Sequence, residues 1–162
     1  MSKEVERNQY IETVLHQIHI AVKSTIEIMD KLDTRDLEIR PTENKFSIGQ
    51  LIAHISLICK ADLLISAEAS EEEMRNFYSS NALHSIAEMK EALLSNFALL
   101  ENRYLSYTEE ELMQKMASYW GVYYTRFEWL LEISSHLYHH RGQLHAMLVH
   151  CVRKDPEVAL FD

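Results

Sequence analysis

Apolar side chains recur at three- and four-residue steps along four long stretches of this chain, residues 5–32, 48–67, 82–104 and 125–152. An α-helix has about 3.6 residues per turn, so this spacing gathers the apolar side chains on one helical face. In the first stretch that face is formed by Tyr10, Val14, Ile18, Val22, Thr25 and Met29. The pattern predicts four long amphipathic helices.

Helix starts are marked where serine or threonine stands three residues before glutamate or glutamine, the pattern of a capping box. It occurs at Ser47 with Gln50, at Thr108 with Glu111, and at Thr125 with Glu128. The first pair is expected to begin the second long helix, and the last pair the fourth. The middle pair predicts a short extra helix ending near residue 117.

Three segments lack a sustained helical period, residues 33–46, 68–81 and 119–124, and we interpret them as connections. With only three glycines and two prolines, the chain has few of the residues that the many tight turns of a β-rich fold require. Four amphipathic helices bury their apolar faces most simply against one another. The sequence therefore predicts an all-α four-helix bundle with one or two short extra helices, as a single domain over residues 1–162.

The formal net charge of −9 changes which partners we expect. Proteins that bind nucleic acids or anionic membranes usually carry a clustered basic face, because it replaces counterions on phosphate groups. The longest run of Lys and Arg here is the pair Arg153 and Lys154. We expect neither a nucleic-acid partner nor a membrane partner.

The remaining composition favours a cytoplasmic protein. Cys59 and Cys151 lie far apart in apolar stretches and form no CxxC pair, as expected in a reducing compartment. Residues 1–7 are charged and lack the apolar centre of a signal peptide. No apolar segment is expected to reach the roughly twenty residues that span a bilayer.

Histidine placement in the last predicted helix points to metal chemistry. His136 and His140 are four residues apart, so their side chains lie one turn apart on the same side of the helix. Two imidazoles at this spacing can approach one metal ion from a rigid support. The pair also borders an apolar stripe that includes Ile133 and Leu144. We therefore expect the pair to point toward or along the core and not wholly into water.

His54 is the best candidate for a third ligand. It lies on a mostly apolar face of the second predicted helix, with no neighbouring carboxylate evident. A buried imidazole is costly unless both nitrogens have partners, and a metal ion would satisfy one of them. The alternative is a histidine satisfied within the core. His139 could replace His136 or His140 if the helix were rotated, but we expect it to be exposed or to lie behind the ligands. A core or surface role is expected for His16, His19, His84, His145 and His150.

Two segments resemble the signature segments of the DinB/YfiT-like metalloenzyme superfamily. They are residues 46–55, FSIGQLIAHI, and residues 136–144, HLYHHRGQL. That family is an up-down-down-up four-helix bundle with a three-histidine metal site. The resemblance implies that His54 provides one ligand and that His136 and His140 provide the other two. It covers most of the chain in length and helix order, with Phe46 standing where the family often has tryptophan.

A site with three imidazole ligands leaves a divalent ion with open positions, as in catalytic rather than structural centres. Zinc or nickel suits imidazole best, with iron and manganese as alternatives. The resemblance implies a homodimer that acts on a small molecule, either as a transferase using a low-molecular-weight thiol or as a hydrolase. The alternative is a stress-associated dimeric bundle whose ion has no catalytic role. No general base is identified.

The residues after His140 allow several roles. Gly142 inside a helix costs stability relative to alanine, which predicts the close approach of another backbone. Gln143 would hold a neighbouring helix end or orient an imidazole, and Arg141 would anchor an acidic side chain. Simple helix packing is the alternative for all three. The aromatic segment 119–124 either lines the mouth of a pocket or packs.

Overall fold

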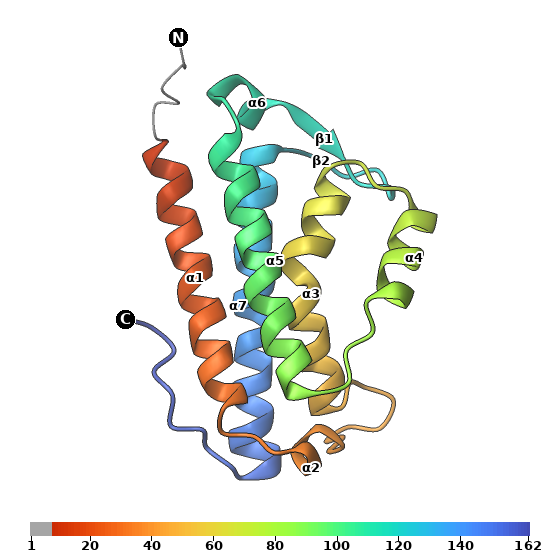
Figure 1. Ribbon diagram of the computed structural model, residues 1–162, viewed down its shortest axis with the longest axis vertical. Helices are drawn as coiled ribbons and strands as arrows, with labels where there is room; N and C mark the ends of the chain where they lie inside the picture. The colour runs from red at the N-terminus through yellow and green to blue at the C-terminus, as the bar shows by residue number, and fades with distance from the viewer. Residues whose placement is uncertain (1–7) are drawn as a thin grey trace.

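Figure 1 shows the computed structural model of the protein, which describes residues 8–162. The predicted all-α class is confirmed. The helices are α1 (Gln9–Met29), α2 (Thr34–Leu37), α3 (Ile48–Ser66), α4 (Glu71–Ser80), α5 (Ile86–Ser106), α6 (Glu109–Met113) and α7 (Arg126–Ala146). An antiparallel hairpin of β1 (Lys115–Ala117) and β2 (Tyr123–Thr125) separates α6 from α7, and the π-helical segment η1 (Met147–Val152) extends α7.

The four long helices lie side by side and enclose the core (Figure 1). Helix α3 packs against α5 and α7, and α1 packs against the same two helices. The apolar faces predicted from the sequence meet in the interior. Fully buried core residues come from all four helices and include Ile18, Ile28, Ile55, Leu93, Leu100, Ile133 and Leu144.

Helix α1 begins at Gln9, within the stretch predicted as the first long helix. The Asn8 side chain accepts hydrogen bonds from the backbone of Tyr10 and Ile11, which is the arrangement of an N-cap. Residues 5–7 of the predicted helix lie outside the described residues. Tyr10 was expected on the core face, but it is 78% exposed, and Ile11 is buried in its place.

Helix α3 begins at the predicted capping box. Ser47 Oγ accepts a hydrogen bond from the backbone N–H of Gln50 at 3.1 Å, and Gln50 Oε1 accepts one from the backbone N–H of Ser47 at 3.0 Å. Gly49 then packs against α2, which lies in the predicted connection. A Cβ atom at Gly49 would lie only 2.9 Å from the carbonyl oxygen of Leu37. Glycine thus allows the close contact that fixes the start of the helix carrying His54.

Helix α4 and strand β1 differ from the elements predicted for their segments. Helix α4 forms where residues 68–81 were expected to be irregular, and it is capped by Ser70 with Glu73 and buries Met74 and Phe77. Residues 115–117, predicted as the end of the short helix, instead form β1. The indole N–H of Trp129 donates to the β1 carbonyl of Met116 at 3.1 Å, which ties the hairpin to α7.

Helix α3 corrects the expectation about apolar length. At 19 residues it is long and apolar enough to cross a membrane by length and composition alone. Most of it is buried inside the protein, and the core helix of a soluble protein passes the same test. It therefore adds only weak evidence for a membrane-spanning segment.

Candidate metal centre

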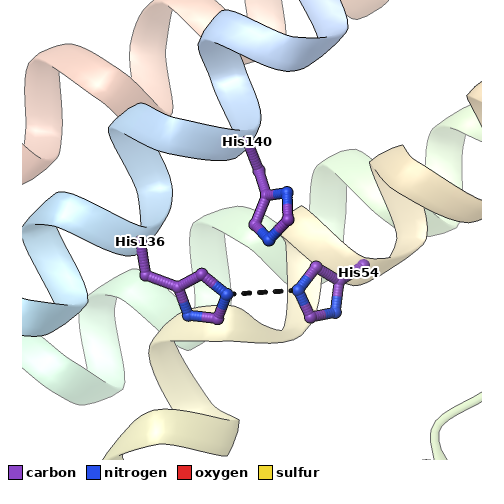
Figure 2. A group of neighbouring side chains, drawn as sticks. All are labelled: His54, His136 and His140. Carbon is purple, nitrogen blue, oxygen red and sulfur yellow. Dashed lines mark hydrogen bonds between the residues drawn. The ribbon is translucent and has the colours of Figure 1, made fainter.

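Three imidazole rings meet between α3 and α7 (Figure 2). His54 comes from α3, and His136 and His140 come from successive turns of α7. The Nε2 atoms of His54 and His136 are 3.3 Å apart. The His54 ring centroid lies 4.6 Å from that of His140. The structure thus brings together all three residues that the sequence singled out, each half-buried.

Two side chains fix the orientation of the rings on α7. Asp62 Oδ2 lies 2.7 Å from His136 Nδ1, and Gln143 Oε1 lies 2.9 Å from His140 Nδ1. A carboxylate or an amide oxygen can only accept in such a bond, so each Nδ1 carries the proton. The Nε2 lone pairs of His136 and His140 are consequently left for a ligand. This arrangement is common around histidines that bind metal ions.

The electrostatics keep two of the rings neutral. Burial, helped by the nearby rings of His140 and His136, lowers the pKa of His54 to about 4. Burial also lowers the pKa of His140. Burial acts in the same direction on His136, but the hydrogen bond and charge of Asp62 outweigh it and raise its pKa. Neutral imidazole is the form that binds metal ions, and Asp62 makes His136 the more basic ligand.

The residues present fit a divalent ion. Metal–nitrogen bonds of about 2.0 Å in a tetrahedral site place neighbouring ligand nitrogens about 3.3 Å apart. That value equals the 3.3 Å between the Nε2 atoms of His54 and His136. The ligand atoms of all three histidines lie within 4.8 Å of one another. Small movements of these side chains would bring all three ligand nitrogens within bonding distance of one ion.

Sequence reasoning missed the acidic side of this cluster. Asp62 follows His54 by two turns and is the only acidic residue of α3, a signal that was present in the sequence. Glu132 precedes His136 by one turn. Burial raises the pKa of Glu132, and the charge of Asp62 raises it further. The expectation that no carboxylate neighbours this region is therefore wrong. The two carboxyl groups favour a cation at the cluster.

Gln143 has one of its predicted roles, because it orients the His140 imidazole. His139 is exposed, as expected, with its ring centroid 4.7 Å from that of His140. Gly142 does not have the predicted close contact: a Cβ atom there would meet nothing within 4 Å. Among the glycines of the described residues, Gly49 is the one that a neighbouring backbone approaches closely.

Arg141 does not anchor an acidic side chain, contrary to prediction. It is buried, and its Nη1 donates to Ser24 Oγ at 3.0 Å and to the carbonyl oxygen of Leu160. Its guanidinium lies over the rings of Tyr138 and Phe161, 4.5 and 4.8 Å from their centroids. It thus holds the C-terminal tail against α7.

The other histidines do not join the cluster within the described residues. His19, for example, stacks on Phe97 with ring centroids 5.6 Å apart. In the aromatic segment, Trp120 and Tyr123 are more than half exposed, whereas Tyr124 packs against Trp129 at 4.9 Å. Packing, rather than the lining of a pocket mouth, accounts for Tyr124.

Comparison with known proteins identifies the family to which the chain belongs. Residues 17–144, a span that includes all three histidines, match the DinB superfamily. The chain belongs to the DinB superfamily. A crystal structure of a protein assigned to the DinB family, from Exiguobacterium sibiricum 255-15, is similar with a TM-score of 0.85 and 25% identity, covering 96% of this chain and 99% of that one.

A second DinB-like protein, from Bacillus cereus ATCC 10987, has a similar fold. Its crystal structure gives a TM-score of 0.70 at 18% identity, covering 93% of this chain and 95% of that one. No curated protein matches the sequence significantly. The DinB resemblance seen in the sequence is therefore confirmed at the level of family and helical fold.

Proposed function

We propose that this DinB protein binds one divalent metal ion through His54, His136 and His140. The observation that carries the proposal is the convergence of three half-buried imidazole rings with their ligand atoms within 4.8 Å. Isolated histidines on a helix face are often core residues. Here three histidines from two helices meet at one point. Two of them, His136 and His140, already bond through Nδ1, which leaves Nε2 of each free to bind an ion.

The three ligands support a catalytic type of centre, since protein groups fill only three positions around the ion. A bound zinc or nickel ion supplies a Lewis acid that lowers the pKa of a coordinated water or thiol. Asp62 and Gln143 hold the rings of His136 and His140 in place. Iron and manganese are the alternative ions.

We place the activity among thiol-dependent transferases or hydrolases acting on a small molecule. The family resemblance supports both classes, and the acidic net charge of −9 disfavours nucleic acid as the substrate. The second candidate is a non-catalytic, stress-associated metal-binding bundle. Access to the ion discriminates between them, because a catalytic ion must exchange a water or thiol ligand with solvent.

Four features of the whole protein belong to the same proposal: the up-down-down-up bundle topology, a single domain over residues 1–162, a cytoplasmic location, and a homodimer. The ribbon directions in Figure 1 support the topology, because α1 and α7 run one way and α3 and α5 the other. The other three rest on composition and on the family resemblance. Size-exclusion chromatography with light scattering tests the dimer.

Elemental mass spectrometry of the purified protein tests the metal site. We expect about one zinc or nickel ion per chain, and its loss in His54→Ala and His140→Ala. His16→Ala is the matched control, because this exposed histidine lies outside the cluster. A wild-type protein that takes up none of zinc, nickel, iron and manganese after loading would refute the proposal. Retention of the ion by both ligand variants would show that it binds elsewhere.

If the ion is present, cobalt substitution followed by thiol titration distinguishes the two candidate functions. Coordination of an added thiol changes the visible spectrum of cobalt and would support the transferase. If neither an added thiol nor a change of solvent ligand alters the cobalt spectrum, the non-catalytic bundle is favoured.

A further inference from the structure

A pocket of about 520 Å³ opens beside the histidine cluster. Helix α7 contributes His140 and Gln143 to its lining, and the segment leading into α3 contributes Arg40, Lys45 and Phe46. His140 is therefore shared by the pocket and the proposed metal site. A molecule in this pocket would therefore lie beside an ion bound at the proposed site.

The charge of the pocket is opposite to that of the whole chain. Arg40 and Lys45 line it, and none of the described residues that line it is acidic. The protein as a whole has a formal net charge of −9. A local basic site in an acidic protein attracts small anions while the rest of the surface repels them.

Two neutral residues of the pocket, Gln50 and Gln143, offer hydrogen-bond donors as well. Gln50 Oε1 already accepts from the backbone of Ser47 and from Arg40 Nη1, each at 3.0 Å. Gln143 Oε1 lies 2.9 Å from His140 Nδ1 and accepts from it. With both amide oxygens engaged, the two glutamines present their NH₂ groups to a ligand. Such a surface suits a ligand rich in acceptor oxygens.

The segment that carries Arg40 and Lys45 is held by its own hydrogen bonds. Arg40 Nη1 donates to the carbonyl oxygen of Lys45, and the backbone N–H of Lys45 donates to Thr42 at 3.2 Å. The backbone N–H of Ile48 donates to Ile39 at 2.9 Å, which closes the segment at the start of α3. Residues 40–45 therefore present their charges from an ordered turn, which reduces the entropy lost on binding.

We propose that this pocket binds the carboxylate or phosphate group of an anionic substrate, with Arg40 and Lys45 as its main contacts. The assignment of that anion as the substrate rests on the proposed metal function, because the pocket would place its reacting part at the ion. The arrangement combines a guanidinium, an ammonium and amide donors, which together match an oxyanion. A neutral isostere would lose these charge-assisted bonds.

NMR titration of the full chain tests the proposal, with malonate, inorganic phosphate and neutral malonamide as probes at fixed ionic strength. We expect malonate or phosphate to shift the backbone signals of residues 40–50 and 139–143, and malonamide to leave them unchanged. Whichever anion binds more tightly identifies the group recognised. Lys45→Gln should weaken that binding about tenfold, which is the order expected for one charge-assisted bond.

Lys23→Gln is the control, since it removes the same charge from an exposed position on α1. It should leave anion binding unchanged. Equal binding of malonamide and the anions, or an unchanged affinity in Lys45→Gln, would overturn the proposal. His54→Ala separates it from the metal proposal, because His54 is a proposed ligand but does not line the pocket. Anion binding that survives in this variant without metal supports the pocket independently.

Discussion

Individual residues around the histidine cluster are expected to tune metal affinity without touching the ion. Asp62 bonds to the far nitrogen of His136 at 2.7 Å and supplies negative charge close to the cluster. Loss of a partner of this kind typically lowers metal affinity by about 10- to 100-fold. The effect of Asp62 on metal affinity can therefore be measured without removing any ligand.

Asp62→Asn is expected to lower zinc affinity by about tenfold while preserving the stoichiometry. Asparagine can still accept the hydrogen bond from His136 but brings no charge. Competition with a chromophoric chelator measures the affinity. Asp155→Asn, the same change in the C-terminal tail, is the control and should have no effect. Equal zinc affinity in Asp62→Asn and the wild type would contradict the role assigned to the carboxylate.

The two cysteines are expected to differ sharply in reactivity. Cys59 is buried, and burial raises the pKa of its thiol to about 12, whereas Cys151 is exposed. Because the thiolate is the reactive form, a disulfide reagent should label only Cys151 in the folded protein and both residues in denaturant. Cys151→Ser should abolish labelling of the folded protein. Fast labelling in that variant would show that Cys59 is accessible.

The sequence pointed to the three histidines, and it shows Asp62 on the same helix as His54, but it did not show that Asp62 contacts His136. The four-residue spacing of His136 and His140 places both on one helix face, and the family resemblance singled out this pair, with His54, as ligands. Asp62 and His136 lie 74 residues apart on different helices. Their contact depends on how α3 and α7 rotate against each other, which the periodicity of either helix does not determine.

At the scale of elements, the long helices were predictable because each has an apolar stripe and a cap. Helix α4 was missed although Ser70 and Glu73 form a capping box just before the buried Met74, so its signal was present. The hairpin is different. Its strands have three residues each, too few to show a period of two, and they depend on contacts with Trp129.

Two glycines provide a matched test of packing between elements. Gly49→Ala should destabilise the protein by about 1–3 kcal/mol, because the new methyl group would press on Leu37. Gly142→Ala should stabilise it by about 0.5–1 kcal/mol, because it removes a helix-interior glycine where the added Cβ meets nothing. Urea unfolding measures both. Effects of the same sign would contradict this assignment of the two glycines.

At the scale of the whole molecule, the C-terminal tail is joined to the bundle through Arg141. This buried side chain contacts Ser24 in α1, the carbonyl oxygen of Leu160 and the ring of Phe161. One residue of α7 thus connects α1 to the tail. The sequence could not show this, because the tail has no periodicity and the contacts are long-range.

Removal of residues 159–162 should lower the free energy of unfolding by about 2 kcal/mol, since Arg141 would lose a charge-assisted hydrogen bond and a ring contact. Urea unfolding provides the measurement, and removal of Asp162 alone is the control. If both truncated proteins were as stable as the full chain, the tail would have no part in stabilising the bundle.

The separation of the ligands along the chain has a consequence for synthesis. His54 and His136 are 82 residues apart, so the ligand set spans half of the polypeptide. On a ribosome, α3 emerges long before α7, and no partial product can hold an ion with all three rings. If the proposed site binds an ion, full coordination by the three rings is therefore expected only once the last long helix has docked. In a cell, retention of the ion would mark those copies whose translation and folding are both complete.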